Sequence, residues 1–371
     1  MPCVSPAYHH SERLPVNLPQ LTELDRRIWD EELEGFCPSR IFDVHTHSYR
    51  WEFNLDPLRD QGPYRKIGEH FPNADWQALV DCDRRLMPGR EVDRLIFPFP
   101  FSPDCDFAAS NQFVAEQAPR HTKSGALMLV HPSMSAEYVE QQVRAHGFLG
   151  LKPYRTYSST GDTVECRIAD FLPRHQIEVA HRLGLIVMMH LSKRDAIADP
   201  ENIADVLELT GEYNRSQWIL AHCARSYSAW AIEQAAPYLR DLDNVWYDTS
   251  SVCESDAFDA LFSTIGVERV LYGSDDAPVG ITRGKYIAFG KAWAFLSESN
   301  QGLDLSHCDG RMTFTRYEQL RAMRRAALRA RLTGEQIEDL FYSTAMRLLG
   351  NVRSGSSPAP APHFVSQTAR H

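Results

Sequence analysis

Between about residues 40 and 275, short runs of apolar and β-branched residues recur, each followed by a longer stretch with helical periodicity. Runs that are apolar at nearly every position, such as LIVMM and RVLYG, are typical of parallel strands buried on both faces. Strands that alternate with helices predict right-handed βαβ units. The eight predicted strands are Arg40–Val44, Val92–Pro98, Ala126–Val130, Phe148–Lys152, Leu185–Met189, Gln217–Ala221, Asn244–Tyr247 and Arg269–Tyr272. Eight such units predict an α/β chain whose sheet closes into a (β/α)8 TIM barrel.

The chain length of 371 residues suits this fold, since such barrels need about 250 residues plus insertions. We predict a single barrel domain over residues 40–350, with a closing helix in residues 333–350. Residues 1–39 are predicted to be an N-terminal extension with one helix, in residues 21–36. Residues 351–371 are rich in Pro, Ser and Ala and are predicted to be a disordered tail.

Charge and hydropathy exclude several classes of partner. A net charge of −10 and the lack of a run dense in Lys and Arg argue against nucleic acid or an anionic membrane as partner. No apolar stretch approaches the roughly 18 residues of a membrane span, and the N-terminus lacks the apolar core of a signal peptide. The eight cysteines form no CxxC pair, which indicates reduced thiols. We expect a cytoplasmic protein with a small-molecule substrate; a homodimer remains open.

Metal-capable side chains end several of the apolar runs. IFDVHTH contributes His45 and His47, LIVMMH contributes His190, WILAH contributes His222, and RVLYGSDD contributes Asp275. These positions are the carboxyl ends of predicted strands, where barrel enzymes carry their chemistry. The period-two alternation of a strand sends both imidazoles of an H-x-H sequence to one face. Imidazoles with one carboxylate suit zinc or another first-row divalent ion.

The same motifs resemble the amidohydrolase superfamily, in its amidohydrolase-related (type 2) branch. The resemblance covers roughly residues 40–350 and rests on DVHTH, the histidines after the fifth and sixth strands, and GSD after the eighth. It implies that His45, His47, His190 and Asp275 hold one divalent ion, Zn²⁺ first, with Mn²⁺ or another first-row ion open. It also implies that His222 lies beside the metal water or substrate and that Asp275 and His222 are catalytic. In part of the superfamily the histidine of the sixth strand also binds metal.

Two further carboxylates flank the expected ligands. Asp275 is preferred to Asp276 because it occupies the third position of the family's GSD pattern, and Asp276 would then cap the following segment. Asp43 lies two residues before His45. By strand alternation we expect Asp43 to point the same way as His45, deeper in the barrel, where it would brace the barrel or a ligand.

Cationic residues follow the predicted strands as well. Lys152, Arg155 and Arg225 are predicted to bind a substrate carboxylate, and Lys193 is a further member of this cationic rim. Two alternatives stay open: Lys152 could be the carboxylated lysine that bridges two metals in binuclear members of the superfamily, and each cation could be a solvated loop charge. Cys223 is interpreted as a packing thiol, because no motif for thiol activation surrounds it.

The sequence therefore predicts a metal-dependent hydrolase that acts on a small, carboxylate-bearing molecule through a metal-activated water. Two alternatives remain. The resembling decarboxylases use the same constellation to release carbon dioxide, and a barrel that has lost catalysis would only bind a ligand.

Overall fold

The computed structural model describes residues 18–61, 65–118, 123–297 and 304–354. At its centre lies a parallel eight-stranded sheet in which each strand pairs with the next one along the chain. The strands are β1 (Arg40–His47), β2 (Glu91–Phe97), β3 (Gly125–Leu129), β4 (Gly150–Lys152), β5 (Ile186–Met189), β6 (Gln217–Leu220), β7 (Val245–Asp248) and β8 (Val270–Leu271). All eight predicted strands are confirmed, with small differences at their ends.

The sheet closes between β1 and the segment that contains and follows β8. The backbone N–H of Val44 donates to the carbonyl of Tyr272, and that of Asp275 donates to the carbonyl of His45, both at 2.9 Å. These bonds complete the predicted (β/α)8 barrel. They also fix the Gly-Ser-Asp segment directly beside the H-x-H strand.

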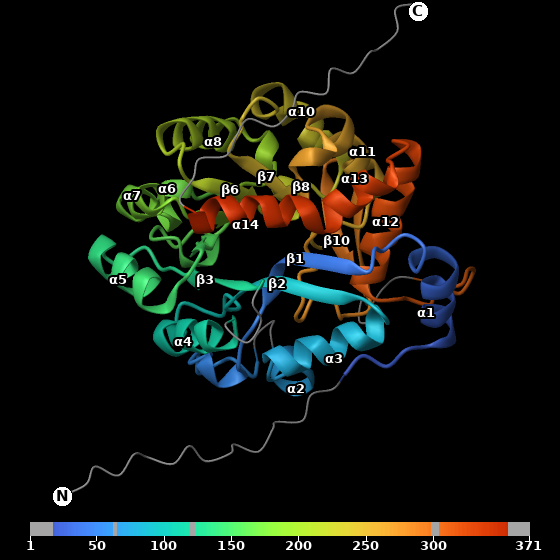
Figure 1. Ribbon diagram of the computed structural model, residues 1–371. Coiled ribbons are helices and arrows are strands. Elements are labelled where there is room, and N and C mark those ends of the chain that lie inside the picture. Colours follow the sequence, from blue (N-terminus) through green and yellow to red (C-terminus); the bar gives the residue numbers. More distant parts are fainter. Residues whose placement is uncertain (1–17, 62–64, 119–122, 298–303, 355–371) are drawn as a thin grey trace, which may run out of the picture.

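Helices surround the barrel (Figure 1). Those between the strands and after β8 are α2 (Arg65–His70), α3 (Trp76–Leu86), α4 (Phe107–Gln117), α5 (Ala136–His146), α6 (Ile168–Phe171), α7 (Arg174–Leu183), α8 (Pro200–Glu212), α10 (Ala229–Leu239), α11 (Ser255–Thr264) and α12 (Thr315–Arg329). The short element α9 (Ala221–Arg225) is a left-handed turn. The predicted N-terminal helix is present as α1 (Glu23–Ile28), continued by a π-helical turn, Trp29–Leu33. It begins at a capping box, in which Thr22 and Asp25 each accept a hydrogen bond from the other's backbone. Residues 1–17 of the predicted extension lie outside the described residues.

The predicted closing segment covers one end of the barrel. It consists of α13 (Gly334–Glu338), a π-helical turn (Asp339–Ser343) and α14 (Thr344–Ser354), and α14 crosses in front of the sheet in Figure 1. The predicted start of the tail at residue 351 is wrong by four residues, because α14 continues to Ser354. The helix continues since Val352 is still buried in the apolar cluster inside the barrel. The rest of that predicted tail, residues 355–371, lies outside the described residues.

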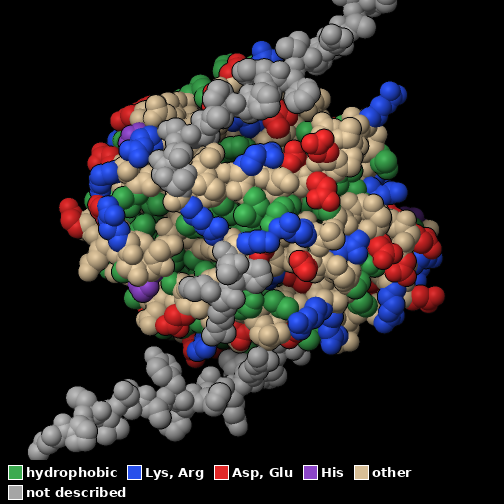
Figure 2. Space-filling model, viewed as in Figure 1, with side chains coloured by type: hydrophobic (Ala, Val, Ile, Leu, Met, Phe, Trp, Pro, Cys, Tyr) green, Lys and Arg blue, Asp and Glu red, His purple; other side chains and the backbone are tan. Residues whose placement is uncertain are grey.

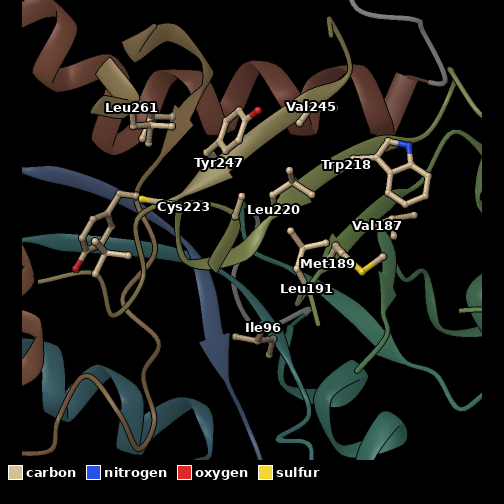
Figure 3. Close-up of a cluster of buried hydrophobic side chains, with 14 of the residues drawn as sticks. Ile96, Val187, Met189, Leu191, Trp218, Leu220, Cys223, Val245, Tyr247 and Leu261 are labelled. Carbon is tan, nitrogen blue, oxygen red and sulfur yellow. The ribbon is translucent and has the colours of Figure 1, made fainter. Parts of the chain in front are cut away.

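Strand residues form two apolar layers. The inward layer, which packs on α14, includes Phe42, Val44, Leu95, Phe97, Leu127, Ile186, Met188, Ile219 and Leu271. Figure 3 shows residues of the outward layer, among them Val187, Met189 and Leu220, which belong to the larger cluster shared with the helices. Because both layers are apolar, the strands read as nearly continuous hydrophobic runs.

The segment after β8 contains an element that the sequence interpretation missed. The strands β9 (Lys285–Phe289) and β10 (Ala292–Leu296) form an antiparallel hairpin. Its two-residue turn begins with Gly290, a signal for such hairpins that was present in the sequence. Tyr286 and Trp293 of the hairpin stack on Tyr227, with ring centroids 4.6 and 4.3 Å away. The hairpin therefore packs against the segment that follows β6.

The surface agrees with the absence of a basic run in the sequence. On the face that Figure 2 shows, Lys and Arg side chains are interspersed with Asp and Glu. None of the helices in the described residues has both the length and the hydropathy needed to cross a membrane. The described cysteines are free, and all of them except the exposed Cys308 are buried.

Candidate metal centre

Three of the four predicted ligands meet at the carboxyl end of the barrel. Nε2 of His45 and Nε2 of His47 lie 3.3 and 3.4 Å from Oδ1 of Asp275, and all three side chains are buried. These atoms form a group of the kind that can hold a metal ion. The H-x-H sequence thus directs both imidazoles to one side, as predicted.

All four predicted histidines are anchored through the same ring nitrogen. The Nδ1 atoms of His45, His47, His190 and His222 face Asp248 Oδ2, Pro98 O, Leu191 O and Ser250 O at 2.8, 3.3, 3.2 and 3.0 Å, respectively. A carbonyl or carboxylate oxygen can only accept, so each Nδ1 carries the proton and donates it. Each Nε2 therefore keeps a lone pair, the tautomer that a metal ligand needs.

The charge state of this group fits a cation. Burial and the nearby Lys152 lower the pKa of His45 to about 4, although Asp248 opposes the change, so the ring is neutral at pH 7. Burial disfavours ionisation of Asp275, but His47, His45 and His222 hold its pKa well below the usual value. Nε2 of His45 is buried without a hydrogen-bond partner. Electron-pair donors that face one another without a proton between them suit a divalent ion with N and O ligands.

His190 and His222 lie next to this group rather than within it. Their rings are 5.1 Å apart, and the ring of His222 lies 5.0 Å from that of His45. The ligand atoms of His190 do not fall within a metal-binding group of the described residues. The structure thus brings three predicted ligands together. His190, the fourth, lies outside this group, next to the ring of His222. Tyr154, which the sequence interpretation gave no role, places its hydroxyl 3.4 Å from Nε2 of His47.

The sequence interpretation also missed Asp248 and Ser250. Asp248 ends β7, as the other predicted ligands end their strands, so its position was the available signal. His45, His222 and Asp248 form a second group with metal-ligand spacing. In this group Nδ1 of His45 lies within hydrogen-bond distance of Asp248, so the two side chains satisfy each other without an ion. Asp248 contacts Nδ1 of His45 and the backbone N–H of His222, and these contacts hold both histidines in place.

The two adjacent aspartates face different partners. Ser251 Oγ donates to Oδ2 of Asp275 at 2.6 Å, and Asp275 has a left-handed backbone with φ of 62°. Asp276 instead forms a buried ion pair with Arg316 of α12. The predicted capping role of Asp276 is therefore replaced by a structural ion pair, and Asp275 is the carboxylate that faces the histidines.

Asp43 braces the barrel, although not from the predicted side. It accepts hydrogen bonds from the backbone N–H groups of His45 and Ser274 at 3.0 and 2.9 Å and from the Ser274 hydroxyl. The expectation that Asp43 points the same way as His45 is wrong. The register of β1 shifts between Asp43 and Thr46, and such a bulge breaks the alternation of side chains.

The segment after β6 forms an uncommon left-handed turn. His222, Cys223, Ala224 and Arg225 have φ of 57°, 50°, 60° and 60°. Each non-glycine residue in this conformation costs about 1–2 kcal/mol, and such strain concentrates at functional sites. Cys223 is fully buried, and burial raises its pKa well above the usual value. This agrees with the predicted packing thiol.

The members of the predicted cationic rim differ in their burial and in their ion pairs. Lys152 is fully buried, its Nζ has no hydrogen-bond partner, and burial lowers its pKa to about 7 despite Asp248 and Asp275. Burial and the charge of Arg155 lower the pKa of Arg225 to about 10. These are not solvated loop charges.

Their contacts show which cations are available to a ligand. Arg225 donates to the Lys193 carbonyl at 2.5 Å, and Arg155 donates to the Thr163 carbonyl. Within the described residues neither arginine pairs with a carboxylate. Lys193 pairs with Glu201, which balances its charge.

One surface cavity, of about 770 Å³, is lined by residues of the 259–268 and 329–336 segments. These segments include the connection that leads into β8, at the opposite end of the barrel from the histidines.

Comparisons with known proteins agree with the geometry. The amidohydrolase family model matches residues 43–350. No curated protein matches the sequence significantly. Similar solved structures include an amidohydrolase from Burkholderia multivorans, with bound HEPES and in another crystal with bound zinc (13% identity, 84% of this chain and 99% of that chain, TM-scores 0.55 and 0.53). Others are 4-oxalomesaconate hydratase from Rhodopseudomonas palustris (17% identity, 85% and 97%, TM-score 0.53) and a probable 2-pyrone-4,6-dicarboxylic acid hydrolase from Acinetobacter baumannii (11% identity, 84% and 99%, TM-score 0.53).

At these identities the solved structures establish the shared fold. The family match spans most of the chain, from the Asp43 of DVHTH to the Gly350 of the closing helix. It therefore includes every strand end that carries a predicted ligand. The chain belongs to the amidohydrolase family.

Proposed function

We propose that the protein is a metal-dependent hydrolase that acts on a small, carboxylate-bearing molecule. One observation carries the proposal: Nε2 of His45, Nε2 of His47 and Oδ1 of Asp275 converge in a buried site with lone pairs facing one another. A divalent ion bound there supplies Lewis-acid polarisation of a substrate oxygen and acidifies water, so that hydrolysis can proceed at neutral pH.

The donor set favours zinc. Two neutral imidazoles and one carboxylate are ligands that zinc prefers. We assign His190 as a further ligand, since its Nδ1 is anchored and its Nε2 carries a lone pair. That an amidohydrolase of the same fold binds zinc accords with this choice, and Mn²⁺ remains the alternative.

The side chains of the site have two proposed roles: some transfer protons, and others supply positive charge to the substrate. Asp275, ionised and buried, accepts the proton of the attacking water and returns it to the leaving group. His222 contacts the substrate and takes part in the same transfer. Arg155, Arg225 and Lys152 supply positive charge to the carboxylate of the substrate. The charges of Arg155 and Arg225 both act on the His190 ring, which supports an anion-binding role for this side of the centre.

The same cations support decarboxylation as a second candidate. They would hold a carboxylate close to His190 and His222, near the position where a carbon–carbon bond could break and a carbon be protonated. A barrel that only binds ligand is the weaker alternative, because three of the four predicted ligands converge and Asp275 is ionised.

Metal analysis tests the proposal. Purified protein should contain about one zinc per chain, and His45→Ala or His190→Ala should reduce that content while circular dichroism stays unchanged. Two ions per chain would instead make Lys152 a bridging ligand. Metal-loaded enzyme should then be incubated with aromatic and unsaturated carboxylates, lactones included. Release of a hydrolysis product supports the hydrolase, and release of carbon dioxide supports the decarboxylase. A protein that binds no metal and forms neither product would overturn both the hydrolase and the decarboxylase proposal.

The anion side has its own test. Lys152→Met and Arg225→Met should each lower kcat/KM for a carboxylate substrate by roughly 10- to 100-fold, typical of a lost charged hydrogen bond, without loss of metal. Arg194→Met is the matched control, because Arg194 is largely exposed and pairs with Glu165. Unchanged kcat/KM in both test variants would remove these cations from the substrate site.

A further inference from the structure

Asp248 connects two groups of the metal centre through one buried carboxylate. Its Oδ2 accepts a hydrogen bond from Nδ1 of His45 at 2.8 Å. Its Oδ1 accepts from the backbone N–H of His222 at 3.0 Å, the residue that begins the left-handed turn. The carboxylate therefore touches the ring of a metal ligand on one side and the backbone of the proton-transfer residue on the other.

The orientation of this carboxylate is fixed. Besides the His222 N–H, Oδ1 accepts from the backbone N–H of Ser250 at 3.0 Å and from the Ser250 hydroxyl. Backbone donors cannot become acceptors, so an acceptor atom must occupy the Oδ1 position.

Neighbouring atoms leave this cluster no room to rearrange. A Cβ placed on Gly273 would lie 2.8 Å from Cβ of His45, 3.4 Å from Cβ of Ser250 and 3.5 Å from Cβ of Asp248. The Ser250 hydroxyl also lies 2.9 Å from Nδ1 of His222 and 3.1 Å from Nδ1 of His45. The absence of a side chain at position 273 allows His45, Asp248 and Ser250 to pack this closely.

We propose that Asp248 is a positioning residue that keeps the proton of His45 on Nδ1 and, through the same carboxylate, holds His222 at the start of its turn. The inference rests on the proposed metal site, because it assigns Nε2 of His45 to the ion. Asp248 does not touch the ion or the substrate; it acts through the two histidines.

The isosteric variant gives a sharp expectation. In Asp248→Asn the amide oxygen must take the Oδ1 position, because three donors point there. The amide NH₂ then faces Nδ1 of His45, and two N–H groups cannot bond to each other. The ring must shift its proton to Nε2, which removes the lone pair that the ion needs. An Asp→Asn change beside a catalytic histidine is known to fix the wrong tautomer in this way.

Zinc affinity measured by chelator competition provides the first readout. Asp248→Asn should bind zinc 10- to 100-fold more weakly than the wild type, the range for partners of metal-bound histidines. Asp248→Ala should bind zinc more tightly than Asp248→Asn, because without a side chain His45 is free to choose either tautomer. A merely structural role predicts the reverse order, since alanine leaves buried donors unpaired. Asp243→Asn, before the same strand and largely exposed, is the matched control.

The tautomer itself provides the second readout. In metal-free protein labelled with ¹⁵N-histidine, long-range ¹H–¹⁵N spectra should show the His45 proton on Nδ1 in the wild type and on Nε2 in Asp248→Asn. This measurement needs only the folded asparagine variant, so it decides the matter even where Asp248→Ala does not fold. Wild-type zinc affinity in Asp248→Asn, or an unchanged His45 tautomer, would overturn the inference alone. A wild-type protein that binds no zinc would overturn the proposed metal site instead.

Discussion

Single residues determine which atoms of the centre can bind an ion. Each histidine donates Nδ1–H to an oxygen fixed by the barrel, so only Nε2 is left for a ligand. Asp275 reaches those nitrogens because its backbone bonds to β1 at the carbonyl of His45. Asp276, one residue later, points to Arg316. The consequence is that adjacent carboxylates face different partners: Asp275 faces the histidines of the candidate metal centre, and Asp276 forms a buried ion pair.

Asparagine substitutions should separate these roles. Asp275→Asn should lower kcat by about 10²- to 10⁴-fold, because an amide cannot accept the proton that a general base takes. It should also lower metal affinity. Asp276→Asn should retain bound metal and most of kcat but lose about 3 kcal/mol of stability, because it breaks a buried ion pair. Metal content, kcat at saturating zinc and urea unfolding distinguish the two. An inactive Asp276→Asn beside an active Asp275→Asn would show that the roles are exchanged.

Burial of His45 predicts how the metal-free protein responds to acid. His45 takes up a proton only near pH 4 in the folded chain, against 6.5 in the unfolded chain. Between these values the unfolded chain binds more protons, so the free energy of unfolding falls as the pH falls. The loss is absent above pH 6.5 and reaches about 3 kcal/mol below pH 4. The lowered pKa values of His47 and His190 act in the same direction.

Urea unfolding of the metal-free protein between pH 7 and pH 4.5 measures this effect. The His45→Asn variant has no imidazole to protonate at this position, so its stability should depend less steeply on pH. Equal pH dependence in the two proteins would contradict the assigned shift.

Elements differed in how far they could be predicted. The barrel strands were recognisable because burial on both faces makes them apolar throughout, and even the two-residue β8 was found as part of RVLYG. The bulge in β1 and the left-handed turn after β6 depend on backbone conformations that leave no periodic pattern. The contacts of Asp248 and Ser250 could not be predicted, because they involve residues of other strands that only the closed barrel brings together. The candidate ligands at the ends of β1 and β8 could be proposed from the sequence because they lie in short recognisable motifs.

Because of its left-handed conformation, the turn should tolerate a glycine substitution better than a helix does. Ala224 and Ala235 are both fully buried, but Ala224 has φ of 60° and Ala235 lies within α10. Glycine at position 224 removes about 1–2 kcal/mol of left-handed strain, which offsets the lost methyl contact and the added chain entropy. At position 235 nothing offsets those losses. Ala235→Gly should therefore be less stable than Ala224→Gly by about 1–2 kcal/mol in urea unfolding. Equal losses would show that the turn is unstrained.

At the scale of the whole molecule, the barrel separates chemistry from stability. The histidines and Asp275 lie at the carboxyl ends of the strands, whereas α14 closes the other end with apolar contacts inside the barrel. The inward layer of Phe42, Val44 and Leu271 lies between them. Barrel enzymes commonly divide the two ends in this way. Changes under α14 should therefore leave the metal centre intact.

Leu348 provides the test of this separation. It is almost fully buried at 1% exposure in the cluster inside the barrel. Leu348→Ala removes apolar contacts and leaves a cavity, which should lower the free energy of unfolding by about 2–5 kcal/mol. Leu328→Ala is the matched control, because Leu328 is 62% exposed and its loss should change stability by less than about 0.5 kcal/mol. Both variants should keep wild-type zinc affinity and kcat at a temperature where they are folded. Weaker zinc binding by folded Leu348→Ala would show instead that α14 supports the metal centre through the barrel interior.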